Sequence, residues 1–82
     1  HVGKTIRERS LMRAMVSLYQ ENRLLHVNSQ EGLLLTIVFK DEEGHEISQV
    51  LTFDAEDDVE IPSGASIVTV SYNDVTLVGM LY

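Results

Sequence analysis

The sequence predicts an α+β domain in which one N-terminal amphipathic helix precedes a small antiparallel β-sandwich or partly open barrel of about five strands. Three observations lead to this prediction. Apolar residues recur at helical spacing over residues 5–21, apolar and polar residues alternate over much of 24–82, and turn-forming residues separate the alternating runs. The length of 82 residues fits one domain spanning 1–82.

The predicted helix spans about residues 5–21. Thr5 and Glu8 have the spacing of a capping box, in which each residue satisfies a backbone N–H of the other. Four apolar residues then follow the i, i+3, i+4, i+7 pattern of one helical face: Met12, Met15, Val16 and Tyr19. Asn22 is a plausible stop, because asparagine tolerates the left-handed conformation found at helix ends.

A β-hairpin is predicted over residues 33–53. Residues 33–40 alternate with a strongly apolar face, and residues 46–53 return with Ile47, Leu51 and Phe53 on one face. Between them lies an acidic turn in which Gly44 can supply a positive φ. Just before this hairpin, residues 24–27 form either a short strand or a linker.

The remainder predicts a second hairpin. Residues 54–58 are expected to form an acidic loop, and residues 59–61 a short strand closed by a turn. Residues 66–72 and 75–82 alternate on either side of a two-residue turn at 73–74.

The final strand is apolar on both faces, and this predicts association with another chain. An apolar strand at a sheet edge is an aggregation hazard unless something pairs with it. Met80 and Tyr82, at its end, are therefore candidate partner-binding residues, and a homo-oligomer is expected.

The net charge of −7 is unevenly distributed. Residues 1–23 carry five cations and two acids, whereas residues 24–82 carry Lys40 and eleven acids. The acidic part should repel nucleic acid and anionic membranes, so neither is expected as a partner. The basic helix would present Arg7, Arg9 and Arg13 either to solvent or to acidic groups on this chain, a second copy or another protein.

No residue pattern predicts a catalytic or metal site. Gly3-Lys4-Thr5 resembles the end of a phosphate-binding loop, but the earlier glycine and strand of that motif are missing. The acidic run at 54–60 lacks the ligand spacing of a calcium loop. His26 and His45 have no histidine at metal-ligand spacing, and there is no cysteine. We therefore expect no enzyme, no cofactor and no metal.

The order of strands and turns over residues 33–72 resembles a known sandwich type. An acidic glycine turn after Phe39, a second acidic turn after Phe53, and the Ile61-Pro-Ser-Gly64 segment before the next strand form this order. It is similar to transthyretin-like and carboxypeptidase-regulatory-like β-sandwich modules. The resemblance implies a β-sandwich for this part of the chain.

These observations predict a non-catalytic protein–protein interaction or assembly module, self-associating through the helix, the C-terminal edge strand, or both. An alternative is an acidic monomeric regulator or inhibitor that occupies a basic site on a target protein. A small hydrolase or nucleotide-binding enzyme is a remote third. The absence of cysteine and of an apolar run long enough to span a membrane favours a cytoplasmic location.

Overall fold

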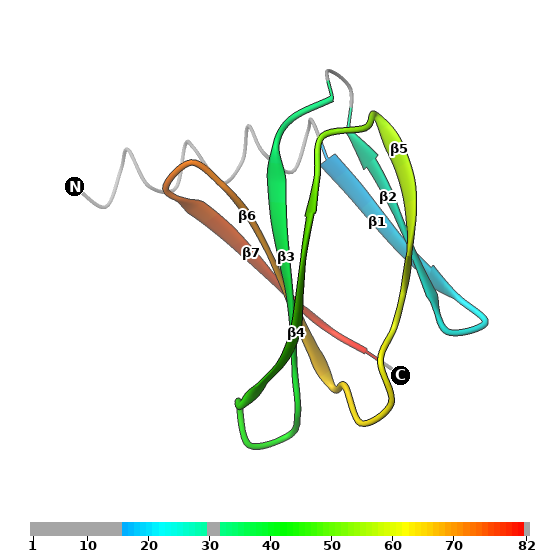
Figure 1. Cartoon of the computed structure of the whole chain (residues 1–82), viewed down its shortest axis with the longest axis vertical. Coiled ribbons are helices and arrows are strands. Elements are labelled where there is room, and N and C mark those ends of the chain that lie inside the picture. Colours follow the sequence, from blue (N-terminus) through cyan, green and yellow to red (C-terminus); the bar gives the residue numbers. More distant parts are fainter. Residues whose placement is uncertain (1–15, 30–31, 82) are drawn as a thin grey trace.

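The computed structural model describes residues 16–29 and 32–81, and these residues form two antiparallel β-sheets (Figure 1). The strands are β1 (Val16–Glu21), β2 (Leu24–Ser29), β3 (Leu35–Lys40), β4 (Glu46–Thr52), β5 (Glu56–Glu60), β6 (Ile67–Tyr72) and β7 (Val75–Met80). One sheet has the order β1-β2-β5, and the other has the order β4-β3-β6-β7. Among the described strands, β1, β5, β4 and β7 therefore lie at sheet edges.

The arrangement is a Greek-key sandwich. The first, second and fifth strands share one sheet, and the fourth joins the third in the other. In immunoglobulin-type sandwiches the C′ strand joins C, F and G in the same way. Apolar side chains from the inner faces and the connecting segments form the core: Val16, Leu25, Val27, Leu33, Leu35, Ile37, Phe39, Val59, Ile61, Val68, Val70 and Val75.

The helix predicted for residues 5–21 is wrong where the structure describes it, because Val16–Glu21 is strand β1. This strand pairs with β2 from Val16 opposite Ser29 to Glu21 opposite Leu24. Asn22 and Arg23 have φ values of 50° and 68°, which suit a two-residue hairpin turn. The left-handed conformation expected at Asn22 is thus present, but it turns a hairpin. Residues 5–15 of the predicted helix lie outside the described residues.

The fold class is consequently all-β over the described residues, with seven strands and no helix, in place of α+β with about five strands. The prediction of an amphipathic helix is wrong for residues 16–21 for the same reason. Within this strand Val16 is buried in the core and Leu18 packs against it, whereas Tyr19 is exposed, and the strand pairs with β2 along its whole length. Tertiary pairing outweighs the short helical pattern that Met12 and Met15 extend toward Tyr19.

Both predicted hairpins are present. β3 pairs with β4, and β6 pairs with β7 through the turn at 73–74. Gly44 has the expected positive φ of 88°. The apolar face of β4 is directed outward, however, since Leu51 and Phe53 are exposed while Val50 and Thr52 are inward.

The expected acidic loop at 54–58 is in part a strand. β5 covers Glu56–Glu60 and pairs with β2 from Asn28 opposite Glu56 to Leu24 opposite Glu60. Acidic residues have low strand propensity. Here the buried Val59 fixes the strand's orientation, while Asp58 and Glu60 extend into solvent.

Candidate functional site

Strand β7 is an edge strand without a charged residue. Its sequence is Val-Thr-Leu-Val-Gly-Met, whereas each other edge strand contains at least one acid. β1 ends at Glu21, β4 begins at Glu46, and β5 consists of four acids and one valine. Charged residues are a common protection against edge-to-edge pairing, and β7 lacks them.

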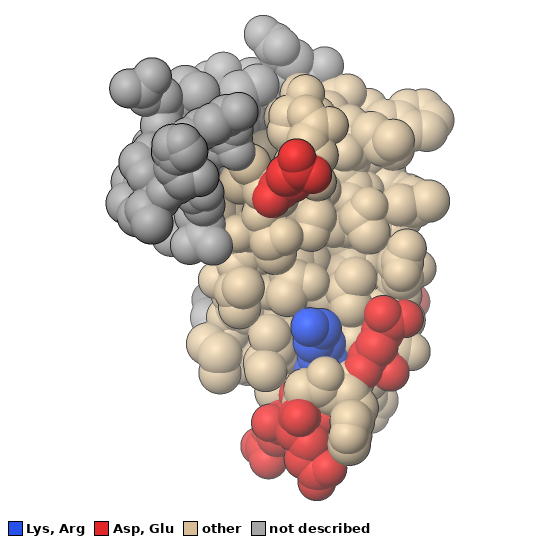
Figure 2. All heavy atoms as spheres, turned by 90° about the vertical axis from the view of Figure 1, so that its left-hand side faces the viewer, with Lys and Arg blue, Asp and Glu red and all other residues tan. Residues whose placement is uncertain are grey.

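The outward side chains of β7 leave apolar surface in solvent. Val78 is 68% exposed and Met80 is 74% exposed, although both lie within a strand. On the adjacent strand β6, Val78 is paired with Thr69 and Met80 is paired with Ile67. Figure 2 views the molecule from the side on which β6 and β7 lie in Figure 1. It shows an uncharged stretch between one acidic residue in the upper part and a cation below the middle, and the other acidic residues in this view lie beside or below that cation.

A groove of about 250 Å³ lies where the edges of β7 and β1 approach each other across the sandwich. Its lining residues are mainly apolar: Leu18, Tyr19, Gln20, Leu25, Val68, Gly79, Met80 and Leu81. Gly79 lies opposite Val68 in the β6–β7 pairing, and a Cβ added to it would be 3.4 Å from a Val68 methyl carbon. The missing side chain at Gly79 therefore helps to keep the groove open.

A second exposed apolar patch lies on β4, at the opposite edge of the same sheet. Leu51 is 61% exposed and Phe53 is 69% exposed, and Leu34, just before β3, is also exposed. This edge is less suited to self-pairing than β7, because β4 begins with Glu46 and adjoins the acidic turn after β3.

A polar row crosses the outer face of the three-stranded sheet. The registers place Tyr19 beside His26 and His26 beside Asp58. The rings of Tyr19 and His26 stack with their centres 5.6 Å apart. The His26 Nδ1 lies 2.5 Å from the Asp58 carboxylate, and its Nε2 lies 3.8 Å from that of Glu21. These contacts link three strands, as cross-strand pairs do in stable sheets.

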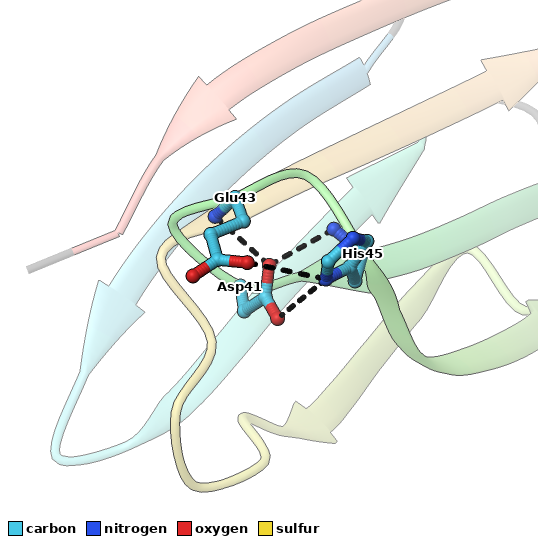
Figure 3. A network of polar contacts seen from close by, with 3 residues as sticks. All are labelled: Asp41, Glu43 and His45. Atoms are coloured by element: carbon cyan, nitrogen blue, oxygen red, sulfur yellow. Dashed lines mark hydrogen bonds and ion pairs between the residues drawn. The ribbon is translucent and has the colours of Figure 1, made fainter.

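The turn between β3 and β4 is organised by Asp41 (Figure 3). The backbone N–H groups of Glu43 and His45 each donate to Asp41 Oδ1 at 2.9 Å. The His45 N–H is the main cause that holds the pKa of Asp41 below its ordinary value, and the Glu43 N–H acts in the same direction against partial desolvation. The His45 ring lies 3.6 Å from the carboxylates of Asp41 and Glu43.

This turn borders a hollow of about 430 Å³ that is also lined by residues 64–66. Its side chains are carboxylates in solvent and small residues, and none is a nucleophile beside a base. Within residues 16–29 and 32–81, no group of three or more His, Cys, Asp or Glu side chains is placed to hold a metal ion. The described residues contain no helix that is long and apolar enough to cross a membrane.

Of the predicted partner-binding residues, only Met80 is among the described residues, and it is exposed on the β7 edge. Arg7, Arg9, Arg13 and Tyr82 lie outside the described residues. Val78 was not predicted as a partner-binding residue from the sequence, although it belongs to the same strand, which is apolar on both faces. The groove at Gly79 could not be predicted, because it depends on the approach of β1 to β7.

Comparison with known proteins gives no further information on these residues. No family model, no curated protein and no solved structure matches this chain.

Proposed function

We propose that this chain is a non-catalytic protein–protein interaction module that assembles with itself through the edge strand β7. The single observation that carries the proposal is an uncharged edge strand whose outward Val78 and Met80 are both more than two thirds exposed. Strand addition at such an edge supplies main-chain hydrogen bonds and removes these side chains from water.

Charge distribution supports β7 over the other edges as the contact between two copies. A like-charged pair directly opposite across two strands is destabilising, and two copies of β5 would bring many carboxylates together. Two copies of β7 can approach without any such pair. The contact therefore lies on the part of the surface where the net charge of −7 opposes association least.

The alternative function is an acidic regulator that occupies a basic site on another protein. The observation that favours it is strand β5, where Glu56, Asp58 and Glu60 are exposed along one edge. Such binding would be lost steeply as salt is added, because exposed charges are screened. A cytoplasmic location is compatible with either function and is proposed on the absence of cysteine alone.

The test is the molar mass in solution, measured by light scattering over a wide range of protein concentration. The wild-type mass should rise from that of one chain toward that of two. The variant Val78→Lys should remain a single chain, since it adds a charge in the middle of the edge strand. Leu51→Lys is the matched control, because Leu51 is similarly exposed on the other edge of the same sheet. It should associate like the wild type.

A wild-type chain that keeps the mass of one copy at every concentration would refute self-assembly and leave the acidic regulator. If Leu51→Lys abolished association and Val78→Lys did not, the assembly would be real but the β4 patch would be its contact.

A further inference from the structure

The direction of the backbone groups in β7 limits how a second copy can pair with it. The Leu81 N–H donates to the Ser66 carbonyl at 2.9 Å, toward β6. Antiparallel strands alternate between residues that bond to one neighbour and residues that point the other way. The backbone groups of Gly79, Leu77 and Val75 therefore also point toward β6. Those of Thr76, Val78 and Met80 point to the open edge.

We infer that two copies pair β7 with β7 in antiparallel orientation about a two-fold axis at Val78, which joins their four-stranded sheets into one continuous sheet of eight strands. This inference rests on the proposed self-assembly and specifies its geometry. The occupant of the edge is a second copy because the edge is uncharged and self-complementary, as a two-fold contact requires.

With the axis at Val78, every backbone N–H and C=O group of β7 that points to the open edge can hydrogen-bond to the second copy. This axis places Val78 opposite Val78 of the second copy, and Thr76 opposite Met80 in both directions. Each of these three pairs exchanges two hydrogen bonds in an antiparallel ladder. With the axis at Leu77 or at Gly79, only two such hydrogen-bonded pairs form within Val75–Met80 instead of three.

Side chains on the inner face favour the same register. With the axis at Val78, Leu77 of one copy lies opposite Gly79 of the other. Side chains directly opposite in such a pair are about 5 Å apart at Cβ. Leu77 packs against the core of its own chain and then lies beside Gly79 of the second copy, which has no side chain to crowd it. An axis at Gly79 would set glycine against glycine, with no side-chain contact at the centre of the pairing.

Outer-face contacts add to the pairing. Val78 meets its own copy on the axis, and Met80 lies beside Thr76 of the second copy. The hydroxyl of Thr76 lies 3.0 Å from that of Ser71 within its own chain, so its methyl group can face Met80. Both exposed apolar side chains of β7 are thereby covered by uncharged neighbours.

A single-cysteine scan tests the register, since the chain has no cysteine of its own. In the inferred dimer the two Cα atoms at position 78 are about 5.5 Å apart, within the range of a disulfide. The matched controls are Thr76→Cys and Met80→Cys, whose copies are about 14 Å apart along the strand. Val78→Cys should cross-link under mild oxidation, with a disulfide-linked fraction at least about tenfold above that of either control.

Light scattering of the reduced variants shows whether each one still associates. A dimer in which Val78→Cys fails to cross-link, or in which a control cross-links equally well, overturns the inferred register while leaving the proposed self-assembly intact. Wild-type protein that stays monomeric overturns both. A strong Val78→Cys cross-link that is absent in 6 M guanidinium, where the fold is lost, supports the folded β7–β7 contact.

Discussion

Asp41 shows how one side chain fixes a turn without being buried. Its carboxylate accepts the backbone N–H groups of Glu43 and His45, and its own backbone N–H donates to the His45 carbonyl at 3.0 Å. Gly44 completes the turn with a φ that other residues rarely adopt. This local network sets the register at the end of β3, where the pairing with β4 has a bulge between Phe39 and Lys40.

The network predicts a specific loss of stability in acid. Because the folded-state pKa of Asp41 is lowered, its contribution is fully present above the ordinary value of 3.8 and is lost as the pH falls through the lower folded value. Asp41→Asn should therefore flatten the fall in melting temperature between about pH 5 and pH 2. Glu42→Gln removes the same charge from the same turn and is the control. If both variants track the wild type over this range, Asp41 does not contribute in this way.

At the scale of elements, the two phenylalanines of the chain lie on opposite faces of the same sheet. Phe39, in β3, has no exposed surface, whereas Phe53, directly after β4, is 69% exposed. Both follow alternating runs, and both were expected on apolar strand faces. Only the packing of the second sheet decides which face becomes the core.

This contrast predicts very different costs for the same substitution. Phe39→Ala should lower the free energy of unfolding by about 3–5 kcal/mol, because it leaves a cavity in the core. Phe53→Ala should change it by no more than about 0.5 kcal/mol, as for an exposed residue. Urea denaturation of both variants measures the difference. Equal losses would mean that the exposed face of β4 is covered in solution, and the mass of Phe53→Ala would then be compared with that of the wild type.

The sequence patterns predicted the central hairpins well and the first and fifth strands poorly. β3, β4, β6 and β7 carry apolar residues on at least one face and have turn residues between partners adjacent in sequence, so local information suffices. β5 is acidic and pairs with β2, about thirty residues earlier, so the local pattern predicted only the short strand at 59–61 and placed the first residues of β5 in a loop. For β1, a window extending back through Met12 and Met15 favoured a helix over the alternation within 16–21. The edge position of β7 followed from the sequence, while the groove at Gly79 required the fold.

Across the whole molecule, charge separates surfaces that can meet a second copy from surfaces that cannot. The acids of the described residues lie mostly on β5 and in the loop before it, on the turn after β3 and at the ends of β1 and β4, while Asp74 in the β6–β7 turn is the one acid next to β7. The outer face of the four-stranded sheet presents mainly threonine, valine and other uncharged side chains between Lys40 and the β7 edge. Association through β7 avoids close contacts between like charges, but it is still opposed by the long-range repulsion of two chains that each carry a net charge of −7.

This balance predicts that salt strengthens the dimer. Raising the salt concentration from about 50 mM to about 500 mM shortens the Debye length from above 10 Å to below 5 Å, which screens the repulsion but leaves the uncharged contact unchanged. The dimer dissociation constant, measured by sedimentation equilibrium, should fall by roughly two- to tenfold. Val78→Lys should remain a single chain throughout. A dissociation constant that instead rises with salt would show that opposite charges hold the copies together. Arg7, Arg9 and Arg13 against the acids of β5 would then replace β7 as the contact to test.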